Sequence, residues 1–116
     1  MRYTVSIKEN RDFRRAYASS KTSVDSFLAV YVRKNRLGIN RLGITVGVKL
    51  GCAVVRNRVR RRLREVYRLN ESRFLPGFDI VVVARSRTTE ASFQELTEAY
   101  MKLAAKAGIL RPEDAQ

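Results

Sequence analysis

The densest group of chemically active side chains is a basic run in the middle of the chain. Seven arginines lie between Arg56 and Arg68, and Glu65 is the only acid among them. A guanidinium group is planar and permanently charged, so it binds phosphate through two parallel hydrogen bonds and stacks on nucleobases. These residues predict the binding of a polyanion.

Side chains that commonly carry catalysis are scarce. The chain has no histidine, which removes the commonest general base and the commonest metal ligand. Cys52 is the only cysteine, so it forms neither an internal disulfide nor a zinc site. A chain without disulfides is typical of the reducing cytoplasm, where we expect this protein. Cys52 stands at the start of a basic helix, where a thiolate is favoured, but we expect a small buried packing residue. If the protein takes part in a reaction, another molecule does the bond chemistry.

The element that must position the arginines is a helix between Gly51 and Arg68. Its apolar residues recur at spacings of four, four, three and one, the pattern of a helix that faces a core. This stripe is Val55, Val59, Leu63, Val66 and Tyr67. At about 100° per residue, the opposite side carries Asn57, Arg60, Arg61, Arg64 and Arg68, flanked by Arg56 and Arg58. A solvated helix without a partner mixes its charges, whereas this one places arginines four residues apart, so we interpret it as a docking surface.

Composition supports one domain, residues 1–116, with a polar tail from about residue 109. The chain holds 24 Lys and Arg against 11 Asp and Glu, a net charge of +13. A folded domain this basic is usually held against nucleic acid or an anionic membrane. A membrane is disfavoured, because the basic helix has no Trp and its apolar face is β-branched. We also find no signal peptide and no apolar run near the roughly 20 residues that span a bilayer.

Periodicity and turn residues predict the remaining elements. Before the arginine helix we expect a loose lead-in over Met1–Ser6, a short helix to about Ala18, a loop over Ser19–Ser26, a strand over Ser26–Arg33, a turn over Lys34–Asn40 and a strand over Arg41–Lys49. The short helix is capped either by Ser6 with Glu9 or by Asn10. After the arginine helix we expect a linker over Leu69–Gly77, a buried strand over Phe78–Ala84 and a last helix that ends near Gly108. Ser92 and Glu95 form a capping box for the last helix, whose inward stripe is Phe93, Leu96, Tyr100, Leu103 and Ala107.

Two faces of these elements have more than one interpretation. In the first helix, Phe13, Ala16 and Tyr17 share one face, and spacing alone makes the two aromatics ordinary core residues. The strand over Arg41–Lys49 carries Leu42, Ile44, Val46 and Val48 on one side and Gly43, Thr45, Gly47 and Lys49 on the other. The second, small-residue side admits a close neighbour, either a packed helix or RNA.

The segment Val48–Glu65, V-K-L-G-C-A-V-V-R-N-R-V-R-R-R-L-R-E, resembles the Arg-Asn-Arg signature of the bacterial ribonuclease P protein family. The resemblance extends through Arg11–Tyr17, Arg41–Val46 and Asp79–Arg85. It implies an α+β fold with a small mixed β-sheet, three helices and a ribosomal-protein-S5-like two-layer architecture. The order strand, helix, strand predicts a parallel βαβ crossover. Such crossovers are right-handed in about 98% of proteins, and the resemblance implies the rare left-handed form.

The resemblance also implies a function. Ribonuclease P removes the 5′ leader from precursor tRNA, and its RNA subunit carries the active site and uses a divalent metal, Mg²⁺, to activate water. The implied partners are ribonuclease P RNA and precursor tRNA, with neither DNA nor a membrane, and the protein alone would be inactive and hold no metal directly. The implied RNA-binding residues are Lys49, Arg56, Asn57, Arg58, Arg60, Arg61, Arg64 and Arg68. The implied leader cleft contains Phe13, Tyr17 and Tyr31, and Tyr31 faces either the cleft or the core.

This chain departs from the family pattern at three places. Val48 and Lys49 stand where two lysines are frequent, Cys52 replaces a small polar residue, and Tyr17 stands where phenylalanine is more usual. One rival interpretation is a ribosomal or other structural RNA-binding protein without a role in cleavage. A binder of duplex DNA is a second, but it needs base-reading side chains, and the arginine helix offers only Asn57.

Overall fold

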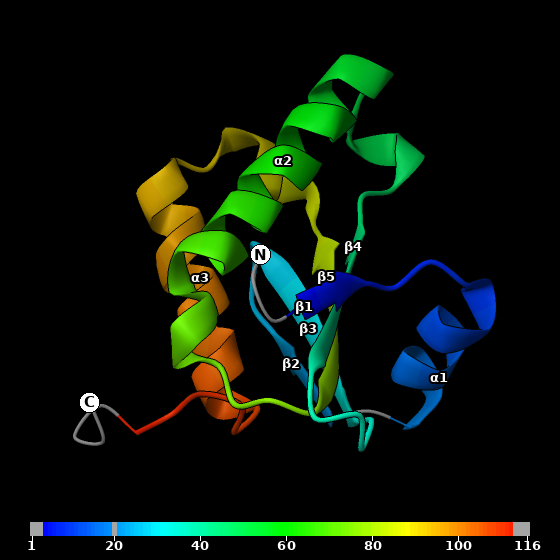
Figure 1. Ribbon diagram of the computed structural model, residues 1–116. Helices are drawn as coiled ribbons and strands as arrows, with labels where there is room; N and C mark the ends of the chain where they lie inside the picture. The colour runs from blue at the N-terminus through cyan, green and yellow to red at the C-terminus, as the bar shows by residue number, and fades with distance from the viewer. Residues whose placement is uncertain (1–3, 20, 113–116) are drawn as a thin grey trace.

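The computed structural model describes residues 4–19 and 21–112, and within them a five-stranded mixed sheet carries three α-helices (Figure 1). The strands are β1 (Thr4–Ser6), β2 (Lys21–Val24), β3 (Leu28–Lys34), β4 (Asn40–Thr45) and β5 (Phe78–Ala84). The helices are α1 (Asn10–Ser19), α2 (Ala53–Asn70) and α3 (Phe93–Lys106), joined in part by the 3₁₀ turns η1 (Val48–Leu50), η2 (Glu71–Arg73) and η3 (Ser86–Glu90). The predicted α+β class is confirmed.

The centre of the sheet is β5. The strand order is β1-β4-β5-β3-β2, with β5 parallel to β4 and antiparallel to β3. Its nearly continuous apolar sequence suits this position, because helices cover both faces of the strand. Helix α2 connects β4 to β5, so the predicted parallel crossover is present; its left hand remains a prediction from the family resemblance.

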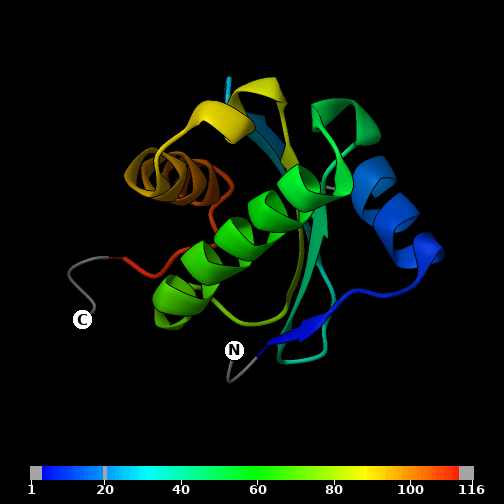
Figure 2. The ribbon, with the colours of Figure 1, turned by 90° about the horizontal axis from the view of Figure 1, so that it is seen from above.

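The two faces of the sheet carry different layers. Helices α2 and α3 lie on one face and α1 lies on the other, as Figures 1 and 2 both show. The α2/α3 face holds the main core, whose largest fully buried side chains include Tyr67, Tyr100, Leu28, Leu63 and Ile80. The α1 face holds a smaller cluster of Ile7, Ala16 and Val81, with Phe13, Tyr31 and Val83 packed against it.

Helix α3 begins with the predicted capping box. The Ser92 hydroxyl accepts a hydrogen bond from the Glu95 N–H at 3.0 Å, and the Ser92 N–H donates to Glu95 Oε1 at 2.9 Å. The helix ends before Gly108, whose φ of 76° closes it as predicted. Four of the five predicted inward residues are buried: Leu96, Tyr100, Leu103 and Ala107. Phe93 was assigned wrongly; it is 38% exposed, because the first turn of the helix protrudes into solvent.

Two short strands replace predicted irregular segments. Thr4–Ser6, expected as a loose lead-in, pairs in parallel with β4, while Met1–Tyr3 lie outside the described residues. Ser6 therefore does not cap the first helix, which begins at Asn10. The predicted loop over Ser19–Ser26 contains β2, an edge strand antiparallel to β3. Both strands escaped prediction because they are three or four residues long and too short to show a period.

Two further predictions were wrong at element ends. The strand expected over Arg41–Lys49 stops at Thr45, and Val48, expected on its apolar side, lies in η1 and is 74% exposed. The tail expected from residue 109 instead starts with a fully buried Ile109. The Arg111 N–H then donates to the Arg73 carbonyl at 2.7 Å, so the chain is held against η2 as far as this residue; residues 113–116 lie outside the described part. No helix in residues 4–19 or 21–112 is long and apolar enough to cross a membrane.

Candidate nucleic-acid interface

Helix α2 separates its two faces as the sequence predicts. Val59, Leu63, Val66 and Tyr67 are at most 1% exposed and pack into the main core. Val55 is only half-buried and lies beside Gly51, where an added Cβ would sit 3.0 Å from Val55 Cγ1. Gly51 also has a φ of 146°, which favours glycine, so this residue allows the chain to enter the helix closely.

The outward face of α2 presents arginines to solvent. Arg58, Arg61 and Arg64 are exposed, whereas Arg56 and Arg60 are half-buried. Arg60 Nη1 donates to Asn57 Oδ1 at 3.0 Å, and Arg56 Nε donates to the Gly51 carbonyl at 3.2 Å. A concave surface on this side is lined by Val54, Asn57, Arg60, Arg61 and Arg64. We call Arg56, Asn57, Arg58, Arg60, Arg61 and Arg64 the arginine face.

Two arginines of α2 are engaged elsewhere. Arg68 forms an ion pair with Glu65, and the Arg68 hydrogen bond lowers the pKa of that carboxyl group. The predicted contact residue Arg68 is thus partly neutralised by its own helix. Arg62 Nη2 donates to the Ala91 carbonyl at 2.6 Å, which ties α2 to the chain just before α3. Arg62 therefore has a structural role.

The residues before α2 complete this end of the surface. Lys49 is exposed in η1, one turn before the helix. Cys52 is exposed at the N-cap, so the expected buried packing role is wrong. Backbone N–H groups of Val55 and Val54 lower the pKa of the Cys52 thiol. The chain turns here through η1 in place of the predicted strand end, and this turn leaves the cysteine outside the core.

The predicted aromatic residues meet on the other face of the sheet. Phe13 and Tyr17 project from α1 and, with Asn10, Arg14 and Thr45, line an open groove beside β4. The Phe13 ring lies directly over Gly43, since a Cβ at that glycine would sit 2.6 Å from Phe13 Cε1. The small-residue side of β4 thus admits a helix, one of the two predicted neighbours.

Tyr17 is the most accessible aromatic of the groove. It is 40% exposed, and its hydroxyl is 2.9 Å from Thr45 Oγ1. The ring of Tyr31, from β3, packs edge-on against it, with centroids 4.9 Å apart and planes at 81°. Tyr31 is half-buried on the α1 face of the sheet, where it supports Tyr17. The structure therefore brings all three predicted aromatics to one side of the sheet.

A network of charged residues that sequence reasoning missed fixes α1 on the sheet. Arg41 of β4 donates to both carboxylate oxygens of Asp79 of β5, at 2.8 and 2.7 Å, and to Asp12 of α1 at 3.4 Å. Burial alone would raise the pKa of Asp79, but hydrogen bonds from Arg41 and Asn35 and the charge of Arg41 hold it below its usual value. The signal was present in the sequence, because Asp79 interrupts an otherwise apolar strand.

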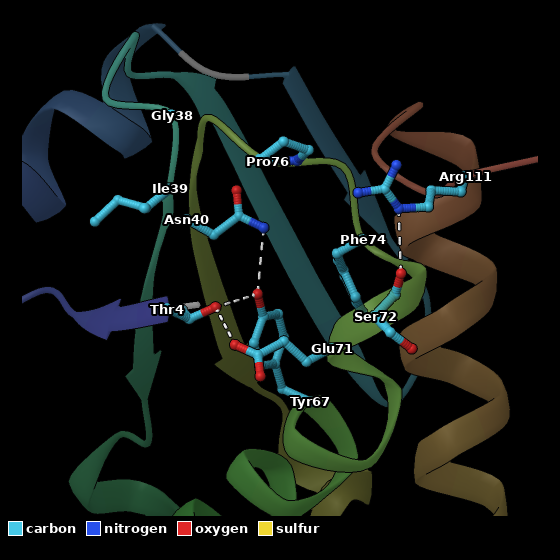
Figure 3. A pocket seen from close by; sticks show the side chains of 10 residues that line it. All are labelled: Thr4, Gly38, Ile39, Asn40, Tyr67, Glu71, Ser72, Phe74, Pro76 and Arg111. Atoms are coloured by element: carbon cyan, nitrogen blue, oxygen red, sulfur yellow. Dashed lines mark hydrogen bonds between the residues drawn. The ribbon is translucent and has the colours of Figure 1, made fainter. Parts of the chain in front are cut away.

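A separate pocket lies at the C-terminal end of α2 (Figure 3). Thr4 donates to Glu71 at 2.6 Å, and its hydroxyl is 2.7 Å from that of Tyr67, which also accepts from Asn40 at 3.2 Å. These polar groups satisfy one another and join β1, β4 and α2. The pocket is a structural junction, and none of the predicted RNA-binding residues lines it.

In residues 4–19 and 21–112, no three His, Cys, Asp or Glu side chains lie close enough together to hold a metal ion.

Comparisons with known proteins agree with this geometry. The sequence model of the family described as Ribonuclease P matches residues 1–108. The ribonuclease P protein component of Natranaerobius thermophilus is 37% identical over 111 residues, which is 96% of both chains. That of Thermoanaerobacter sp. (strain X514) is 42% identical over 108 residues, 93% of both chains.

Solved structures show the same likeness in three dimensions. The RNase P protein of Staphylococcus aureus superposes with a TM-score of 0.84 at 31% identity, covering 91% of this chain and 97% of the other. The RNase P protein of Thermotoga maritima gives a TM-score of 0.81 at 32% identity, covering 87% and 96%.

Proposed function

This chain belongs to the ribonuclease P protein family, and from that membership we propose how its two candidate surfaces share the binding of RNA. Members of the family are the protein component of ribonuclease P, an endoribonuclease of tRNA processing. The chain is therefore a subunit of that holoenzyme, with ribonuclease P RNA as its partner. The proposal concerns which residues meet which RNA.

The arginine face binds phosphates of the ribonuclease P RNA. Arg58, Arg61 and Arg64 are exposed and make no ion pair among the described residues. A rigid helix anchored by its buried stripe presents them with little loss of backbone freedom. Lys49 extends the same surface, whereas Arg68 contributes less because Glu65 already pairs with it.

The groove on α1 holds the single-stranded 5′ leader of precursor tRNA. The observation that supports this is the 40% exposure of Tyr17 beside Phe13, because an aromatic that only filled a core would be buried. Aromatic stacking accepts any base, at about 1–3 kcal/mol per base. A groove of this kind suits an enzyme whose substrates differ in leader sequence.

Cleavage itself belongs to the RNA subunit. Hydrolysis of the phosphodiester bond would release the leader, and Mg²⁺, if bound by the RNA subunit, would activate the water for that hydrolysis. The protein residues bind and orient: the arginine face keeps the catalytic RNA in place, and the groove fixes the leader beside it. We place this work in the cytoplasm, where tRNA matures in bacteria.

The test compares precursor and mature tRNA as ligands of the reconstituted holoenzyme. Tyr17→Ala should weaken precursor binding by about tenfold, since each decade corresponds to about 1.4 kcal/mol, and should leave mature tRNA binding unchanged. Phe13→Ala should act in the same direction. Phe93→Ala is a matched control, because Phe93 is an aromatic of similar exposure, 38% against 40%, on the opposite side of the sheet.

Three outcomes would contradict the proposal. Equal weakening of both tRNA ligands by Tyr17→Ala would mean that the groove does not hold the leader. Equal weakening by Phe93→Ala would mean that the effect is not local. A protein that binds the RNA subunit without stimulating cleavage at low magnesium would be the structural RNA-binding protein of the rival interpretation.

A further inference from the structure

The pocket at the C-terminal end of α2 takes no part in either proposed RNA surface, and its cavity is large enough for a small ligand (Figure 3). The cavity measures about 430 Å³, within the range of about 300–1,000 Å³ that is common for small-molecule sites. Segments far apart in the sequence build it: β1, the start of β4, the end of α2 with the residues that follow, and Arg111. The pocket therefore exists only in the folded protein.

The polar groups that line the pocket are fixed by hydrogen bonds. Asn40 Nδ2 donates to the Leu75 carbonyl at 3.0 Å, and Asn40 Oδ1 accepts from the Phe78 N–H at 2.9 Å. The hydroxyl groups of Thr4 and Tyr67 lie 2.7 Å apart. A ligand does not have to order these side chains when it binds, so the loss of conformational freedom on binding is small.

Three apolar side chains also line the pocket. Ile39 and Pro76 are exposed there, and Phe74 adds a buried aromatic ring. A flat ring that lies against these side chains removes apolar surface from contact with water, which favours binding. The apolar part of the pocket therefore suits an aromatic ligand.

Arg111 supplies a positive charge at the same pocket. Its N–H donates to the Arg73 carbonyl at 2.7 Å and its Nε donates to the Ser72 carbonyl at 3.2 Å, so the side chain is held beside the cavity. In residues 4–19 and 21–112 it makes no ion pair, and neither of its Nη groups makes a hydrogen bond. A guanidinium group binds a carboxylate through two parallel hydrogen bonds, so the Arg111 Nη groups suit a ligand with such a group.

A negative charge in the pocket limits what the ligand can be. Glu71 accepts from the Thr4 hydroxyl at 2.6 Å and lines the cavity, and Figure 3 draws Phe74 between Glu71 and Arg111. In a chain with a net charge of +13, an acid at this place disfavours a polyanion such as RNA, because further negative charges on the ligand are repelled by it. The pocket therefore suits a ligand with a single negative group at one end of an apolar body.

From these observations we infer that the pocket is a binding site for a small aromatic carboxylate. The ring of the ligand lies against Ile39, Phe74 and Pro76, and its carboxylate pairs with Arg111. Such a ligand holds β1, β4 and the end of α2 together, so it stabilises the folded protein by mass action. The inference does not depend on the proposed division of RNA binding, because no residue of the arginine face or of the leader groove lines this pocket.

The test titrates the full chain with 3-phenylpropionate and follows the amide signals by two-dimensional NMR. The buffer holds about 0.15 M KCl, which screens exposed charges more than about 8 Å apart. We expect the amide signals of Thr4, Gly38 and Ser72 to shift and those of Arg61 and Arg64 to stay in place. The Kd should be on the order of 1 mM, which is ordinary for a ligand of this size.

Matched variants and matched probes separate the pocket from net charge. Arg111→Gln should weaken the binding of 3-phenylpropionate by about fivefold, whereas Lys102→Gln, which removes the same charge from an exposed position on α3, should change it by less than about twofold. With the wild-type protein, 3-phenylpropionamide has the same size without the charge and should bind about fivefold more weakly. Acetate, which has no ring, should leave the pocket signals in place. Phenyl phosphate, which carries up to two negative charges, should bind more weakly than the carboxylate.

Four results would overturn the inference, and none of them bears on the arginine face or the leader groove as RNA-binding surfaces. If no pocket signal shifted up to about 10 mM probe, the cavity would not be a site for small aromatic acids. If the shifts were confined to Arg61 and Arg64, the probe would bind to the arginine face. Equal weakening by Lys102→Gln would make the effect one of net charge. If phenyl phosphate bound as tightly as the carboxylate, the pocket would be a general site for anions.

Discussion

The two faces of the sheet are built on different principles. On the α2/α3 face, adjacent helices bury a continuous apolar core that includes Leu63 and Tyr67. On the α1 face, the buried cluster is three residues, and a charged network joins Asp12, Arg41 and Asp79 beside it. The first face provides most of the stability, because apolar burial is the dominant favourable term in folding. The second provides the geometry of the groove.

The difference shows what a binding groove requires of a fold. A helix held by a large apolar area would bury its aromatics, as α3 buries Tyr100. Helix α1 instead leaves Tyr17 accessible. Hydrogen bonds from Arg41 to Asp12 fix the position of the helix without covering the Tyr17 ring. A buried ion pair of this kind is often no more stabilising than apolar residues in its place, although removal of one partner is costly. We infer that its contribution here is to specify a geometry.

The largest expected effect tests the apolar face. Leu63→Ala should lower the free energy of unfolding by about 2–5 kcal/mol, because the fully buried side chain leaves a cavity. Arg64→Ala, the next residue, is exposed and should change it by less than about 0.5 kcal/mol while weakening RNA binding. Urea denaturation and RNA titration of both variants measure the contrast. Equal destabilisation would show that the two sides of α2 are assigned wrongly.

The next effect tests the charged network through pH. The pKa of Asp79 is lower in the folded protein than in the unfolded chain, so the unfolded chain takes up its proton first as the pH falls. The stabilisation is therefore complete above a pH of about 4, the usual carboxyl range, and is lost as the pH falls through the folded pKa. Asp79→Asn should cost about 1.5–3 kcal/mol at pH 7, as charged hydrogen bonds do.

The cost of Asp79→Asn should depend on pH. Urea denaturation at pH 7, 5 and 3 should show that the difference in the free energy of unfolding between wild type and Asp79→Asn becomes smaller toward pH 3. A difference that stays constant over this range would mean that the carboxylate charge of Asp79 does not stabilise the fold. Asp25→Asn serves as a control, since Asp25 makes no ion pair among the described residues.

A smaller effect tests the contact between α1 and β4. Gly43→Ala places a methyl group 2.6 Å from Phe13 Cε1, so the tip of the ring must move toward the groove. We expect a loss of roughly 1 kcal/mol of stability, at the low end for overpacking, together with weaker binding of precursor tRNA but not of mature tRNA. Gly47→Ala is the matched control, because a Cβ there meets nothing within 4 Å. Identical behaviour of the two variants would exclude a role for the close contact.

Local patterns predicted the elements whose periodicity is long and whose ends carry turn chemistry. The arginine helix and the capping box of α3 are of this kind. The failures share a different cause, because Val48 and Cys52 lie where the chain leaves β4 through a 3₁₀ turn that no period marks. The pairing of Asp79 with a charge from another strand depends on the strand order, and so does the approach of Tyr31 to Tyr17. Such contacts join residues far apart in sequence, which local reasoning does not reach.

The smallest expected effect concerns the hydroxyl of Tyr17. Tyr17→Phe removes the hydrogen bond to Thr45, which is exposed and therefore worth less than about 1 kcal/mol to folding. The ring and its edge-on contact with Tyr31 remain, so stacking on leader bases should be retained, and precursor affinity should change by less than about threefold. Thr45→Val removes the same bond from the other side and should behave alike. If either variant weakened precursor binding as much as Tyr17→Ala is expected to, the two hydroxyl groups would be the recognition element. The groove would then bind the leader through hydrogen bonds and not through stacking.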